Sequence, residues 1–278
     1  MSLPSFDPAD YPAQLAEKLA RFKHDFAPFE LPEPTVCESA TQAYRLRAEF
    51  RMWHDGARID YAMFDPADPK RAIVIDDFPP AAAPIAAAMP RLRERLMASE
   101  ALKRKLFQVD FLATLSGELM ITLIYHRPLD AAWEADAALL AADLGVQLIG
   151  RSRKQKIVLG RDWLLEEFEL NGRRLRYKQI ENSFSQPNGE MNRQMLGWAC
   201  ARAAGIGGDL LELYCGNGNF TVALAPLFGR VLATEVSKPS VAAAEFSLEA
   251  NAIDNVTMVR MSSDEISDAL AGGRDYRR

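Results

Sequence analysis

Hydrophobic and polar positions alternate in the first two thirds of the chain, as they do in strands with one buried face. In RLRAEFRM (45–52) every second residue is apolar, and three of the four residues between them are arginines. The segment therefore predicts a strand with one cationic face. Glycine-containing pairs predict the turns of three hairpins, at Asp55-Gly56, at Ser116-Gly117 within 106–126, and at Asn171-Gly172 within 163–179.

Helical spacing appears in two segments of the same region. Residues 10–23 predict an amphipathic helix with Asp10 as its cap, and residues 130–145 predict a helix that ends at Gly145. The proline-broken segment 78–90 is interpreted as a loop leading into a helix. Residues 1–180 are thus predicted to form a mixed α+β domain with an antiparallel sheet.

After about residue 180 the pattern changes to alternating helices and short apolar strands. A helix is predicted over 190–205, and buried strands over 209–214, 230–235 and 256–261. This order is that of a doubly wound, Rossmann-like α/β domain, which we assign to residues 181–278. Such domains normally have five or six strands, so we expect this one to be incomplete at its C-terminal end.

Composition excludes several classes of protein. The 278 residues carry a net charge of −5 and contain three cysteines without a C-x-x-C pair and three separated histidines, so neither disulfides nor a metal site is expected. The sequence has no long apolar run and no export signal, which predicts a cytoplasmic protein with no membrane association. Cations nevertheless cluster at 91–105, 151–156 and 173–178, where they predict either solvated faces or a surface for RNA.

The segment LLELYCGNGNFTVALA (210–225) predicts a strand, a glycine loop and a helix, the arrangement that holds nucleotide-like ligands at a sheet edge. Gly216 and Gly218 are followed by Thr221 where the dinucleotide fingerprint has its third glycine, so NAD fits poorly. Glu235 at the end of the next predicted strand is either an ordinary strand-end carboxylate or an acceptor for two ribose hydroxyls. The second alternative favours S-adenosylmethionine.

Five segments resemble, in this order, the tRNA (uracil-5-)-methyltransferase family. They are YRLRAEFRMWHDG (44–56), KLFQVDFL (105–112), ENSFSQPN (181–188), LLELYCGNGNF (210–220) and LATEVSKPSVAAA (232–244). The resemblance implies S-adenosylmethionine-dependent methylation of carbon 5 of the T-loop uridine at position 54 of tRNA. The implied partner is the T-arm of tRNA, or a tRNA-like RNA, bound by a monomer.

The resemblance also implies roles for individual residues. The residues expected to bind the cofactor are Gln186, Tyr214, Gly216, Gly218, Asn219 and Glu235. Those expected to bind RNA are Arg51, Phe107 and His126, although the alternation of its strand also permits Phe107 to be core.

The family reaction needs a cysteine thiolate that adds to uracil carbon 6 and a base that removes the carbon 5 proton. The family cysteine lies in a Ser-Cys-Asn-Pro motif and the base is a later glutamate, and this sequence has neither motif. We therefore expect no catalytic residue in this chain, nucleophile and base beyond Arg278, and no activity from the 278 residues alone. Cys215 is interpreted as a small residue of the cofactor loop. A protein that binds RNA without catalysis, or a methyltransferase for a small molecule or protein, are the alternatives.

Overall fold

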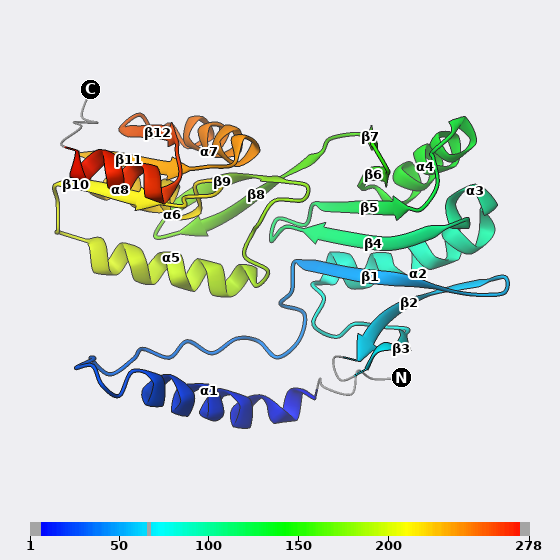
Figure 1. The fold of residues 1–278 in the computed structure, drawn as a ribbon, viewed down its shortest axis with the longest axis horizontal. Helices are drawn as coiled ribbons and strands as arrows, with labels where there is room; N and C mark the ends of the chain where they lie inside the picture. Colours follow the sequence, from blue (N-terminus) through cyan, green and yellow to red (C-terminus); the bar gives the residue numbers. More distant parts are fainter. Residues whose placement is uncertain (1–6, 66–67, 273–278) are drawn as a thin grey trace.

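The computed structural model describes residues 7–65 and 68–272, which form two sheet-based parts joined side by side (Figure 1). The larger part is a seven-stranded sheet with the order β3-β2-β1-β4-β5-β6-β7. Its strands are β1 (Arg47–Asp55), β2 (Arg58–Asp65), β3 (Asp68–Ile75), β4 (Leu106–Ala113), β5 (Leu119–Tyr125), β6 (Gln147–Ser152) and β7 (Gln155–Leu159). Neighbouring strands are antiparallel except β5 and β6, which are parallel because α4 (Ala131–Leu144) carries the chain back between them.

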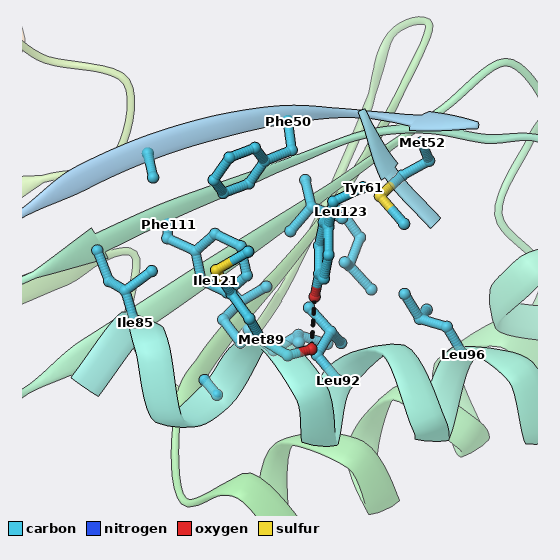
Figure 2. Packing of buried hydrophobic residues seen from close by; sticks show 14 of the residues in the cluster. Phe50, Met52, Tyr61, Ile85, Met89, Leu92, Leu96, Phe111, Ile121 and Leu123 are labelled. Carbon is cyan, nitrogen blue, oxygen red and sulfur yellow. Dashed lines mark hydrogen bonds between the residues drawn. The ribbon is translucent and has the colours of Figure 1, made fainter. Parts of the chain in front are cut away.

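One face of this sheet is covered by α2 (Ala83–Ala98), α3 (Glu100–Lys103) and α4, and the main core lies between the two layers. Figure 2 shows α2 side chains such as Ile85 and Leu92 packed against Phe50 and Phe111 of the sheet. The Tyr61 hydroxyl, inside this core, donates a hydrogen bond to the carbonyl of Met89 at 2.9 Å. The opposite face of β1 and β4 therefore remains available for charged side chains.

The helix α2 corrects the prediction of a loop over residues 78–90. It begins at Ala83 and continues through Pro90. An internal proline removes one backbone hydrogen bond and costs about 3 kcal/mol. Five buried apolar side chains on α2 offset that cost: Ile85, Ala88, Met89, Leu92 and Leu96.

The smaller part contains a parallel sheet with the order β10-β11-β12, as the sequence predicted for an α/β domain. Its strands are β10 (Asp209–Leu213), β11 (Arg230–Glu235) and β12 (Val256–Arg260). The helices of this part are α5 (Gly189–Ala203), α6 (Asn219–Leu224), the 3-10 helix η2 (Ala225–Leu227), α7 (Lys238–Ala250) and α8 (Ser263–Ala271). The hairpin of β8 (Trp163–Leu170) and β9 (Arg173–Ile180) packs against α5, α6 and α7 through a second core that includes Phe168, Leu175 and Tyr177.

The N-terminal helix agrees with its prediction in extent but differs at its cap. After the 3-10 helix η1 (Pro8–Asp10), α1 runs over Tyr11–Asp25 with Asp10 at its N-cap. The Asp10 side chain makes no capping hydrogen bond; Asp7 instead accepts from the Ala9 N–H at the start of η1. The three predicted hairpins are confirmed, whereas β3 and the β6–β7 hairpin were not predicted.

Candidate cofactor site and RNA-facing surface

The glycine loop between β10 and α6 has left-handed backbone at three positions, two of which are glycines. Tyr214, Gly216 and Gly218 have φ angles of 56°, 58° and 82°, in the left-handed region that favours glycine. The Cys215 N–H donates to the carbonyl of Thr234 on β11 at 3.0 Å, which fixes the loop to the neighbouring strand. A side chain at Gly216 would extend into open space, so the glycine leaves room for a ligand beside the backbone.

Glu235 lies at the end of β11 and turns toward this loop. Its Oε2 accepts from the Gly216 N–H at 3.1 Å, and its Oε1 accepts from the Ser237 N–H at 2.7 Å. Each carboxylate oxygen can accept a second hydrogen bond. The two oxygens can therefore receive two adjacent hydroxyl groups while the backbone holds the carboxylate in place.

Asn219 fastens the start of α6 to α5 through a residue that the sequence did not indicate. The side-chain amides of Asn219 and Asn192 exchange two hydrogen bonds of 2.8 and 2.9 Å, and Asn192 is buried. The Tyr177 hydroxyl also donates to the Asn219 carbonyl at 3.1 Å. The observed side-chain bonds of Asn219 thus support the loop rather than extend toward its open side.

Gln186 belongs to the segment 181–188, which the seven-stranded sheet holds in position. The Arg47 guanidinium on β1 donates to the Ser183 carbonyl and, at 3.3 Å, to the Ser185 hydroxyl. The Leu46 N–H donates to the Pro187 carbonyl at 2.7 Å. Arg47 is therefore a positioning residue for this segment, and sequence reasoning missed it because 136 positions separate it from Ser183.

Two aromatic rings, one in the segment 181–188 and one in the cofactor loop, are open to solvent. Phe184, two residues before Gln186, is 78% exposed, and Tyr214 is 69% exposed. The sequence signal for Phe184 was its place inside ENSFSQPN, but its exposure follows only from the structure.

Burial raises the pKa of the loop thiol Cys215 and of Glu212 on β10. The pKa of the Cys215 thiol rises to about 12, first through burial and then through the nearby carboxylates of Glu212 and Glu235. The pKa of Glu212 rises to about 7 through burial, while the Thr221 hydroxyl donates to it at 2.7 Å. A thiol with that pKa is protonated at neutral pH and is a poor nucleophile. The geometry thus supports the interpretation of Cys215 as a loop residue.

The three residues expected to bind RNA form one stack on the seven-stranded sheet. The Arg51 guanidinium lies 3.8 Å from the centre of the Phe107 ring, and the Phe107 and His126 rings stack with centres 4.0 Å apart. Phe107 is half-buried rather than part of the main core. The stack lies on β1, β4 and the end of β5, whereas the cofactor loop follows β10 in the smaller part.

Metal chemistry has no candidate site among residues 7–65 and 68–272, where no group of three or more histidine, cysteine or acidic side chains is arranged to hold an ion. In the same residues, no helix combines the length and apolar character needed to cross a bilayer.

Comparisons with known proteins match the whole chain. A family model described as tRNA (Uracil-5-)-methyltransferase matches residues 10–278. The tRNA/tmRNA (uracil-C(5))-methyltransferase of Azoarcus sp. (strain BH72) is 75% identical over 278 residues, which are 100% of this chain and 76% of that protein. The protein of the same name from Dechloromonas aromatica (strain RCB) is 65% identical over 100% of this chain and 77% of its own length. The chain thus spans about three quarters of these relatives.

Among solved structures, the chain is similar to the tRNA (uracil-54, C5)-methyltransferase of Pyrococcus abyssi in complex with S-adenosyl-L-homocysteine. The TM-score is 0.66 at 17% identity, covering 90% of this chain and 63% of that one. Similarity at this identity concerns the fold, and it agrees with the Rossmann-like assignment.

Proposed function

The chain belongs to the tRNA (uracil-5-)-methyltransferase family, and we propose that it serves the transfer of a methyl group from S-adenosylmethionine to carbon 5 of uridine 54 in the T-loop of tRNA. The observation that carries the proposal is the family match over residues 10–278, together with a glycine loop whose backbone is bound by Glu235. S-adenosylmethionine supplies the electrophilic methyl group.

The residues around the loop fit this cofactor. Glu235 has acceptor capacity for both ribose hydroxyls, and Gly216 and Gly218 let a ligand approach the backbone. Tyr214 lies in the loop itself and Gln186 in the segment 181–188, and both would complete the contacts. Asn219 would act through its bonds with Asn192, which hold the start of α6.

The described residues would bind and orient the cofactor and the RNA, and they do not supply the nucleophile. The buried Cys215 thiol keeps its proton at neutral pH, because its pKa is about 12. The family reaction requires a thiolate for carbon 6 and a base for the carbon 5 proton, and the Ser-Cys-Asn-Pro motif that carries the thiolate is not in these 278 residues. The chain by itself should therefore bind both partners without forming product.

The RNA partner we propose is the T-arm of tRNA, or a tRNA-like RNA with the same loop. A stack of a guanidinium, a phenyl ring and an imidazole suits bases that are splayed out of a loop. We expect the protein to act as a monomer in the cytoplasm.

Methyl transfer should be measured with two preparations: the native gene product from its source cells, and the 278-residue chain. Each is incubated with unmodified tRNA and labelled S-adenosylmethionine, and the tRNA is digested to nucleosides for mass spectrometry. We expect 5-methyluridine at position 54 from the native product, and binding of both partners without product from the 278-residue chain. A label at another position or on another substrate would contradict the proposal. RNA binding by both preparations without any label would favour the alternative of a binding protein.

A further inference from the structure

Four exposed cations lie at the end of the seven-stranded sheet that carries the stack of Arg51, Phe107 and His126. They are Arg104, Lys105, Arg153 and Lys154, which we call the basic rim. Within residues 7–65 and 68–272, none of the four forms an ion pair. Their charge is therefore free to meet an anionic partner.

Hydrogen bonds place the rim directly beside the stack. The His126 N–H donates to the carbonyl of Lys105 at 3.1 Å, which joins the segment before β4 to the end of β5. The Arg127 guanidinium donates to the carbonyl of Arg104 at 3.0 Å, and the Ser152 hydroxyl donates to the carbonyl of Arg127. Residues 153–154, which form the turn after Ser152, thus lie at the same sheet end, where β5 ends and β4 begins at the right of Figure 1.

Unlike the basic rim, the arginines of α2 form ion pairs. Arg91 and Arg95 both pair with Asp143, and Arg93 pairs with Asp60 and Asp76. The cluster at 91–105 is therefore neutralised on the helix layer and keeps free charge only at its last two residues, Arg104 and Lys105.

Acidic groups near the rim leave its charge in excess. Asp130 pairs with Arg127 at 3.4 Å, and Glu100 pairs with Lys103 at 3.1 Å. Asp55 is exposed at the end of β1. Glu100 and Asp130 are exposed as well, but each pairs with a cation outside the rim. Against the exposed carboxylates of Asp55 and Glu49, the four rim cations and Arg51 leave an excess of positive charge at the sheet end in a chain of net charge −5.

We propose that the basic rim binds backbone phosphates of the RNA strand that leads into and out of the nucleotides held by the stack. The inference rests on the proposed function and adds residues to its RNA site. Phosphate contacts fix the position of an RNA, whereas the stack receives the bases. Arg104 and Lys105 lie where β4 begins, and Arg153 and Lys154 lie on the turn after β6, the strand beside β5. Cations at these two places can contact phosphates on successive parts of the RNA strand.

The test is the salt dependence of binding between the 278-residue chain and a labelled T-arm stem-loop RNA. The variant R104A/K105A/R153A/K154A should weaken binding about 100-fold at 0.15 M salt and lower the slope of log affinity against log salt by about 3, at roughly 0.7 to 0.9 per phosphate contact. The matched control K18A/R21A/R174A/R202A removes four exposed cations that also form no ion pair in the described part of the chain. It should change the slope by less than 1.

The outcomes separate this inference from the proposed function. S-adenosylmethionine binding should be unchanged in both variants, which shows that they fold. Equal slopes for the rim variant and the control would overturn the rim as a phosphate site, since charge alone would then explain binding. If the unaltered chain bound the T-arm no better than a hairpin with a different loop, the proposed function itself would fail, whatever the slopes.

Discussion

Glu235 has two roles, support of the loop backbone and the proposed contact with the ribose, and one substitution can distinguish them. Its carboxylate binds the N–H groups of Gly216 and Ser237, and its remaining lone pairs are the acceptors proposed for the ribose hydroxyls. Hydrogen bonds to a charged group contribute about 1.5 to 3 kcal/mol each. We expect E235Q to bind S-adenosylmethionine 10- to 100-fold more weakly, measured by isothermal titration.

A substitution that only loosened the loop would weaken cofactor binding by the same amount. The decisive measurement is therefore whether the protein distinguishes a ligand with the ribose 2′-hydroxyl from one without it. The unaltered chain should bind S-adenosylhomocysteine more tightly than its 2′-deoxy analogue, and E235Q should bind the two with similar affinity. E245Q, which changes an exposed carboxylate of α7, is the matched control and should behave as the unaltered chain. Retained discrimination in E235Q would contradict the ribose role.

The sequence predicted the positions of those site residues that belong to a short motif or to the end of a predicted strand. The glycines, Tyr214 and Glu235 follow from strand ends and a short motif, and the structure brings Gly216 and Glu235 together through a hydrogen bond. Arg47 and Asn192 could not be found in this way. Their partners lie on segments that meet only after folding, and an arginine on an alternating strand has the same pattern whether it contacts solvent or a distant loop.

The hairpin of β8 and β9 docks onto the β4–β5 turn through a buried carboxylate. Both oxygens of Glu166 accept from the Leu115 N–H at 3.0 Å. Burial raises the pKa of Glu166 to about 7, and Glu118 adds to that rise. The folded state therefore holds its proton at pH values where the unfolded chain has lost it. Stability should fall as pH rises from about 4.5 to about 7, and should level off above that.

Replacing Glu166 with glutamine should remove this pH dependence, because an amide stays neutral and keeps one oxygen for Leu115. At pH 8 we expect E166Q to be more stable than the unaltered chain by on the order of 1 to 3 kcal/mol. The difference should shrink toward pH 4.5. Urea unfolding at several pH values measures it. E167Q is the control, since Glu167 pairs with Arg176 at the surface and a surface pair contributes less than about 1 kcal/mol. A pH-independent difference for E166Q would contradict the argument.

Elements with strong local signals were predicted well, and those decided by tertiary packing were not. The Asp-Gly, Ser-Gly and Asn-Gly turns and the stop at Gly145 depend on left-handed backbone, which short sequences encode. The start of α2 was missed because Pro90 locally disfavours a helix that the core nevertheless stabilises. The β6–β7 hairpin turns at Arg153 and Lys154, whose composition indicates a charged surface rather than a turn.

The sites proposed for the RNA and for the cofactor lie in different parts of the molecule. The stack lies toward the end of the seven-stranded sheet where β4 begins, and the cofactor loop lies in the part formed by β10, β11 and β12 (Figure 1). Strand β1 links them, because Arg47 binds the segment that carries Gln186 while Arg51 joins the stack. Substitutions only four residues apart on one strand should therefore have separate effects.

We expect R47A to weaken S-adenosylmethionine binding about 10-fold, since it removes charged hydrogen bonds that hold the Gln186 segment, and to leave T-arm affinity within about threefold. F107A should do the reverse, because loss of one stacked base costs about 1 to 3 kcal/mol and the ring is remote from the cofactor loop. Titrations of both ligands against both variants measure the four affinities. R47K is informative as well: both bonds, to the Ser183 carbonyl and the Ser185 hydroxyl, start from the single guanidinium nitrogen Nη1, so a lysine ammonium can replace them and R47K should keep more cofactor affinity than R47A. If R47A weakened RNA binding as strongly as F107A does, β1 would be part of one continuous RNA site, and the two functions would share it.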